Sequence, residues 1–119
     1  MHELSIATKV VALATDHAAA HPGASIAAVT LRIGQLSCVH EDALRTAFAI
    51  ARECTPLAEA ELRIVTVPVI VWCPECRAER ELPGIQRLAC PDCGRPTGDI
   101  RAGRELDLES LELVETADA

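Results

Sequence analysis

The chain has 119 residues, half of them hydrophobic, which suffices for one domain or for a small domain with a metal-stabilised lobe. Its formal net charge of −7, with one Trp, one Phe and no Tyr, disfavours nucleic-acid binding, which needs a basic face and usually aromatic stacking platforms. The apolar run 67–72 is far shorter than the roughly 20 residues that cross a bilayer. Near the start of the chain Glu3 is acidic, whereas a signal peptide carries Lys or Arg there, so we expect a cytoplasmic protein that does not bind membranes.

The first half of the chain predicts a helix, a strand and a second helix. Apolar residues recur at helical spacing over 4–20, residues 25–33 alternate as a half-buried strand does, and a second helix follows over 39–53. Ser37 is the expected cap of the second helix. The residues expected to face the core are Leu4, Ala7, Val11 and Ala14 with Ile6, Val10 and Leu13 beside them; Ala27, Val29, Leu31 and Ile33; and Leu44, Ala47, Phe48 and Ala51.

Two further strands are expected after the second helix. The first covers 62–67, with Leu62, Ile64 and Thr66 facing inward. In the last strand the apolar residues are Leu106 and Leu108, then Leu111 and Leu113. This change from even to odd positions predicts a β-bulge at 109–110.

These elements predict an α+β fold, in which a small three-stranded sheet packs with two helices and a zinc-ribbon lobe is inserted between the second and third strands. The expected domains are 1–68 with 104–119, and 69–103. The inserted lobe contains the most informative motifs of the chain.

Four cysteines form two Cys-x-x-Cys motifs, Cys73-Pro-Glu-Cys76 and Cys90-Pro-Asp-Cys93. Each motif turns two thiolates toward one ion, and the two motifs together complete a tetrahedral sulfur site that suits a structural zinc ion. Disulfides are disfavoured in a chain without a secretory signal. Iron is the competing ion, because Cys-Pro-Asp-Cys-Gly is similar to half of a rubredoxin site, but the aromatic core of rubredoxins is missing.

The other two cysteines, Cys38 and Cys54, flank the second predicted helix. A helix spanning them would hold them about 24 Å apart, so they cannot pair with each other. Since free cysteines are among the most buried residues, we expect buried or half-buried thiols without a metal role.

The chain start offers a second metal site. The Met1 amine, the next backbone amide and the His2 imidazole can close adjoining chelate rings in one plane, a geometry that suits nickel(II) or copper(II) better than zinc. Glu3 can add an oxygen, a further amide nitrogen or an outer-shell acceptor. On the residues alone, a solvated side chain at a frayed chain end is the simpler interpretation of His2.

Six segments together resemble the HypA/HybF family of hydrogenase maturation proteins. They follow one another in order along essentially the whole chain and are Met1-His2-Glu3-Leu4-Ser5-Ile6, residues 31–37 (LRIGQLS), residues 43–48 (ALRTAF), the two cysteine motifs and residues 100–106 (IRAGREL). The resemblance implies a nickel metallochaperone, not an enzyme, that serves maturation of NiFe hydrogenase and, in some organisms, urease.

The resemblance also implies the sites and partners. Transient Ni(II) is assigned to His2, helped by the Met1 amine and Glu3, and structural Zn(II) to Cys73, Cys76, Cys90 and Cys93. The implied partners are a HypB-type GTPase and the hydrogenase large-subunit precursor, and the protein itself is expected to be a monomer or a weak homodimer.

Two departures from the family pattern stand out. No histidine lies beside the cysteine motifs, and Cys54 stands where relatives often have Gly. Two alternative functions remain. One is a zinc-ribbon module that binds no nickel and either mediates protein interaction or associates with nucleic acid, and the other is a redox iron protein.

Overall fold

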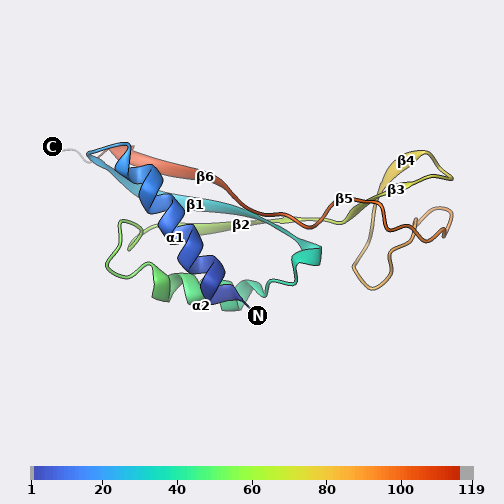
Figure 1. Cartoon of the computed structure of the whole chain (residues 1–119), viewed down its shortest axis with the longest axis horizontal. Helices are drawn as coiled ribbons and strands as arrows, with labels where there is room; N and C mark the ends of the chain where they lie inside the picture. The colour runs from blue at the N-terminus through green and yellow to red at the C-terminus, as the bar shows by residue number, and fades with distance from the viewer. Residues whose placement is uncertain (1, 116–119) are drawn as a thin grey trace. The chain divides into compact units, whose positions relative to one another are not determined.

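The structure, a computed structural model, describes residues 2–115 and divides into two compact units. Unit 1 is built from the residues up to Leu31, from Val39–Ile64 and from Leu108 onward, and unit 2 from Arg32–Cys38 and Val65–Asp107. The elements in chain order are α1 (Glu3–Ala19), β1 (Ala24–Gly34), the short 3-10 helix η1 (Gln35–Ser37), α2 (Glu41–Ala51), β2 (Glu61–Val67), β3 (Ile70–Cys73), β4 (Ala78–Glu81), β5 (Ile100–Ala102) and β6 (Leu106–Glu115) (Figure 1).

The strands form two three-stranded sheets, ordered β2-β1-β6 and β4-β3-β5. The predicted α+β fold class is confirmed, with two helices, a three-stranded sheet and a cysteine lobe inserted between β2 and β6. The sheet of the lobe has three strands, because β3 pairs with both β4 and β5. No helix in the described part of the chain is long and apolar enough to cross a membrane.

In unit 1 the two helices pack against each other through their apolar stripes. Arg45 on α2 and Arg52, the C-cap residue of α2, reach β2 and the residue before it: Arg45 Nη1 donates to the Leu62 carbonyl oxygen at 2.8 Å, and Arg52 Nη1 donates to that of Ala60 at 2.7 Å. The buried helical residues are Glu3, Ala7, Val10, Val11 and Ala14 of α1 and Leu44, Ala47 and Phe48 of α2.

Several helical predictions were wrong in detail. Leu4 and Leu13 were expected to face the core but are 55% and 44% exposed, because the buried stripe of α1 is narrower than the apolar one. The cap of α2 is His40 rather than Ser37, since His40 Nδ1 accepts from the Ala43 N–H at 3.2 Å. Ser37 lies in η1 instead, and its hydroxyl donates to the Gly34 carbonyl oxygen at 2.7 Å.

The strand predictions were also wrong at single positions. In β1, Ala28 is buried although it was expected on the outer face, and Ala27 is only half-buried. In β2, Val67 is buried and Thr66 is exposed, the reverse of the prediction.

In β6, Leu106 is 46% exposed rather than buried. Glu109 and Ser110 are both exposed between the half-buried Leu108 and Leu111, so the alternation changes where it was expected to change. The bulge itself stays a prediction.

Unit 2 has a small core of its own. Val69, Val71 and Leu82 are buried, and Leu36, Leu88 and Ile100 pack against them. The segment Arg32–Cys38 is tied to this unit by two backbone hydrogen bonds, from Gly34 N–H to the Glu105 oxygen at 2.8 Å and from Leu36 N–H to the Gly103 oxygen at 2.7 Å. Unit 2 therefore includes a segment that lies far from the cysteine motifs in the sequence.

Candidate metal centre

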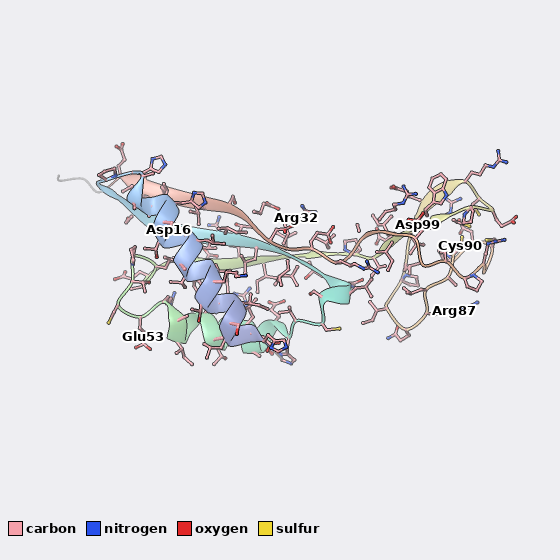
Figure 2. The ribbon with its side chains drawn as sticks, viewed as in Figure 1. Asp16, Arg32, Glu53, Arg87, Cys90 and Asp99 are labelled. Carbon is pink, nitrogen blue, oxygen red and sulfur yellow. The ribbon has the colours of Figure 1, made fainter. Side chains whose placement is uncertain are left out.

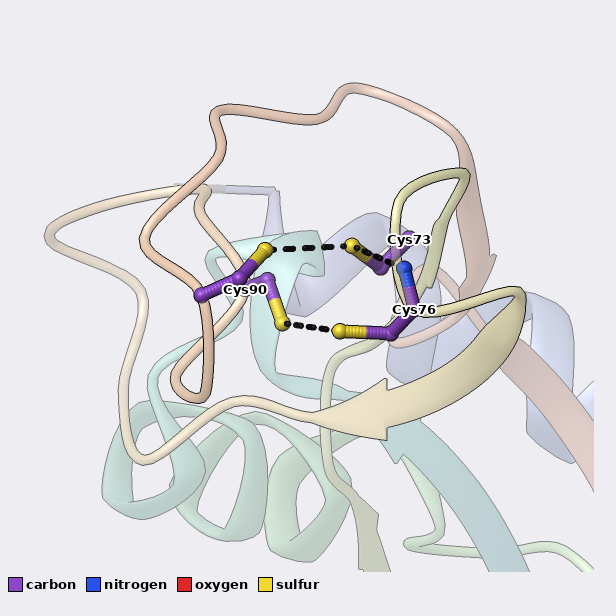
Figure 3. Close-up of side chains that lie close together, drawn as sticks. Cys73, Cys76 and Cys90 are labelled. Carbon is purple, nitrogen blue, oxygen red and sulfur yellow. Dashed lines mark hydrogen bonds between the residues drawn. The ribbon is translucent and has the colours of Figure 1, made fainter.

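The four thiols of the two Cys-x-x-Cys motifs meet in unit 2, with all four Sγ atoms within 4.8 Å of one another. Cys73 Sγ lies 3.5 Å from Cys93 Sγ, and Cys76 Sγ lies 3.9 Å from Cys90 Sγ (Figure 3). A tetrahedral zinc site with bonds of about 2.3 Å requires sulfur atoms about 3.8 Å apart, whereas a disulfide requires about 2 Å. The sulfur positions therefore fit one tetrahedral metal ion and no disulfide.

The two motifs have the same local shape. Cys73 ends β3 opposite Ala78, and the Cys76 N–H donates to Cys73 Sγ at 3.5 Å. In the second motif, the Cys90 N–H donates to the Arg95 carbonyl oxygen at 2.9 Å, and Ala89 pairs with Pro96. Each pair of cysteines thus sits on a tight antiparallel turn that points both sulfurs to one centre.

The thiols perturb one another. The pKa of Cys76 is raised to about 12, first by its hydrogen bond with Cys73 and then by burial. The pKa of Cys90 is lowered to about 6, first because the backbone N–H of Cys93 donates to its sulfur. Four thiolates so close together repel one another, and a bound divalent cation relieves that repulsion.

Each motif also contains an acid that pairs with an arginine that follows the other motif in the sequence. Glu75 Oε1 lies 3.0 Å from Arg95 Nη1, and Asp92 Oδ2 lies 2.7 Å from Arg80 Nε, close but without hydrogen-bond geometry. Burial lowers the pKa of Arg80, yet Asp92 and the Cys76 sulfur raise it above its ordinary value overall. Arg80 thus brings positive charge to the sulfur cluster. Cys90 and Arg87 lie on the loop that follows β4 (Figure 2).

The residue after each motif adopts a left-handed backbone, and this gives a testable prediction. Arg77 has φ 52° and Gly94 has φ 79°. This conformation costs a residue with a side chain about 1–2 kcal/mol, whereas glycine adopts it freely. A Cβ on Gly94 would meet nothing within 4 Å, so Gly94→Ala is expected to destabilise the metal-loaded protein by about 1 kcal/mol from backbone strain alone.

Arg77→Gly is the matched change in the first motif. It relieves strain but gives the unfolded chain more freedom, so it is expected to stabilise by less than about 1 kcal/mol. Urea unfolding of both variants measures the two effects. No loss in Gly94→Ala together with a loss in Arg77→Gly would contradict the strain argument.

The chain start lies in unit 1. His2 is the N-cap residue of α1, its side chain is exposed and makes no capping hydrogen bond, and its carbonyl oxygen accepts from the Ile6 N–H at 3.0 Å. Glu3 is buried, and its Oε2 accepts from the His40 N–H at 3.0 Å. The Met1 amine lies outside the described residues.

Sequence reasoning missed His40, which the fold brings against Glu3. Its ring caps α2 while its backbone N–H binds the Glu3 carboxylate, so the starts of both helices are joined at one point. Only a contact between residues 37 positions apart reveals this, and no local pattern signals it.

The two remaining thiols were predicted wrongly. Cys38 and Cys54 are exposed, not buried or half-buried. Both have left-handed backbones, with φ 62° and 61°, because each lies where the chain turns next to α2. Such turns are on the surface.

The chain matches the family described as "Hydrogenase/urease nickel incorporation, metallochaperone, hypA" over residues 1–113. It is 55% identical to the hydrogenase maturation factor HypA of Chloroflexus aurantiacus over 112 residues, which cover 94% of this chain and 98% of that protein. It is 43% identical to the HypA of Deinococcus radiodurans over 108 residues, which cover 91% and 89% of the two chains.

The fold is also similar to that of solved HypA structures. The solution structure of the Ni metallochaperone HypA from Helicobacter pylori superposes with a TM-score of 0.66 at 28% identity, over 97% of this chain and 99% of that one. The family description is that of a metallochaperone, not of an enzyme. The family match over nearly the whole chain, the close relatives and the shared fold lead to one conclusion: this chain belongs to the HypA family of hydrogenase/urease nickel-incorporation metallochaperones.

Proposed function

We propose that this protein binds Ni(II) at its amino terminus and delivers it to the hydrogenase large-subunit precursor, with urease as a further client in some organisms. The observation that carries the proposal is the exposed His2 at the start of α1, in a chain of this family. The proposed ligands are the His2 imidazole, the Met1 amine and the adjoining backbone amides.

The helix start supports this assignment. The first amide groups of an α-helix have no acceptor within the helix, so nickel can replace their protons without breaking the helical hydrogen-bond ladder. The Glu3 carboxylate is turned toward His40, which favours a positioning role for Glu3 over direct ligation. A planar site at a chain end can also be dismantled one ligand at a time, which suits transfer to a recipient.

In this proposal the two domains bind different metal ions. Residues 1–68 and 104–119 hold the nickel, while residues 69–103 hold a structural zinc ion through Cys73, Cys76, Cys90 and Cys93. A closed site of four thiolates leaves no open position for substrate, so the zinc stabilises its lobe and does no chemistry. The protein would act in the cytoplasm beside a HypB-type GTPase.

Nickel titration of the untagged protein tests the proposal. His2→Ala is expected to weaken the tight nickel site by about 100-fold or more, beyond the loss typical of a group that only supports a ligand. Calorimetry measures the affinity, and zinc content should not change.

Two matched changes sharpen this test. One extra residue before Met1 converts the amine to an amide and should weaken binding as well, whereas Glu3→Gln, which keeps an acceptor for the His40 N–H, should cost less than His2→Ala. Tight nickel binding that survives His2→Ala would refute the site. A zinc-loaded protein that binds no nickel would favour the interaction-module alternative.

A further inference from the structure

The fold of unit 2 brings the side chain of Arg80 beside the four thiols. In the β3-β4 ladder Cys73 lies opposite Ala78, and Val71 lies opposite Arg80. Residues two apart on a strand share one face of the sheet, so Arg80 is on the face that carries the buried side chains of Val71 and Cys73. The register of β4, which begins just after the first motif, thus fixes where this arginine lies.

Arg80 interacts with both cysteine motifs. Its Nε lies 2.7 Å from Oδ2 of Asp92, a residue between the two cysteines of the second motif. Burial lowers the pKa of Arg80, while Asp92 and then a hydrogen bond with the sulfur of Cys76, in the first motif, raise it. One side chain therefore bridges the two halves of the metal site.

The Nε of Arg80 is a buried donor without an acceptor. Within the described residues it makes no hydrogen bond, because Asp92 lies close but without the required geometry. The great majority of buried polar atoms in folded proteins have a hydrogen-bond partner. An unsatisfied donor beside the thiols therefore indicates that its acceptor forms when the metal ion binds.

The charge of the loaded site supplies that acceptor. A divalent ion held by four thiolates leaves a surplus of negative charge on the sulfur atoms. Hydrogen bonds from a guanidinium to an anionic acceptor are shorter and stronger than bonds between neutral groups. A thiol that loses its proton to the metal is thus a better partner for Arg80 than the free thiol.

From this placement we propose that Arg80 is a positioning residue of the metal site, which donates to the metal-bound sulfur of Cys76 and contacts the second motif through Asp92. The donated hydrogen bond lowers the electron density on the sulfur, so the metal is displaced less readily. A protein that hands over one metal needs its structural metal to stay in place. The inference rests on the metal site assigned to the four thiols and not on the amino-terminal nickel site.

Arg95 offers a matched comparison. It also pairs with an acid inside a cysteine motif, since its Nη1 lies 3.0 Å from Glu75 Oε1. Its side chain is 52% exposed, against 33% for Arg80. The backbone oxygen of Arg95 accepts from the Cys90 N–H, a contact that a change of the side chain leaves in place.

Cobalt(II) bound to the full-length protein in place of zinc tests the hydrogen bond to sulfur. Sulfur-to-cobalt charge-transfer absorption moves to longer wavelength when a thiolate loses a hydrogen-bond donor. Arg80→Met keeps the length of the side chain but no donor, and it is expected to shift this band. Arg95→Met is expected to leave the band in place, and Arg80→Lys, which keeps a charged donor, should shift it less than Arg80→Met.

Zinc affinity is the second measurement, made by competition with a chelator. Arg80→Met should weaken zinc binding by about 10-fold to 100-fold, as when a group that supports a metal ligand is removed, and Arg95→Met should not. Asp92→Asn removes the ion pair but keeps the donor, so it should keep the band position and cost less affinity than Arg80→Met.

An unmoved band in Arg80→Met, or equal losses of affinity in Arg80→Met and Arg95→Met, would overturn the inference. A loss in Asp92→Asn as large as that in Arg80→Met would also overturn it, because Arg80 would then act through the ion pair alone. None of these results touches the metal site itself, which fails only if the wild-type protein shows no charge-transfer band. Circular dichroism of the zinc-loaded variants confirms that they are folded.

Discussion

Cys73→Ala is expected to release the metal of unit 2 and to unfold that unit. Its sulfur is buried, lies 3.5 Å from Cys93 Sγ and ends the central strand of the β4-β3-β5 sheet. Metal binding contributes on the order of 10 kcal/mol to the folding of small zinc lobes, and three thiolates retain only part of it. The apolar core of unit 2 is too small to compensate, because within the described residues its central buried cluster consists of Val69, Val71 and Leu82, with partly buried side chains around it.

Zinc content and the dispersion of amide signals measure this loss. Signals of unit 2 should collapse, while the helices of unit 1, which bury Leu44 and Phe48, should remain. Cys38→Ala is the matched control, since it removes an exposed thiol outside the cluster and should change neither reading. Full zinc occupancy with an ordered lobe in Cys73→Ala would show that the ligand set is wrong.

Gly34→Ala is the second change with a large expected effect. A Cβ on Gly34 would overlap the carbonyl carbon and oxygen of Gly103 and would lie 2.6 Å from the Arg104 nitrogen. These are backbone atoms, which cannot rotate away as a side chain can. The substitution should therefore destabilise unit 2 by about 3 kcal/mol or more, at the upper end of the range for overpacking.

Gly98→Ala is the matched control for this prediction. A Cβ there would meet nothing within 4 Å, so the change should be close to neutral. Urea unfolding of both variants, loaded with metal, separates steric overlap from the general effect of replacing glycine. Equal stability of the two variants would contradict the close approach of Gly34 to Gly103.

Local patterns predicted the elements and the thiol cluster well. Cys73 and Cys76 are close in sequence, so the spacing alone fixes how their sulfurs turn, and the second motif repeats that geometry. Helical and strand periodicity likewise located both helices and three of the six strands, because each pattern is a local property. What these patterns lack is information about the neighbours of each element.

The errors follow from that missing information. Leu106 and Leu4 are apolar and correctly spaced, yet among the described residues neither is fully covered, and both are about half exposed. The exposure of Cys54 was likewise not predictable from local patterns, because its left-handed φ of 61° belongs to the turn after α2.

The interleaving of the two units has a consequence for the order in which they can fold. Unit 1 combines Val39–Ile64 with the residues from Leu108 onward, and most of unit 2, Val65–Asp107, lies between these segments in the sequence. For unit 1, an unfolded unit 2 is a long flexible loop, and the entropic cost of closing such a loop grows only slowly with its length. Unit 1 can therefore fold while unit 2 still waits for its metal ion.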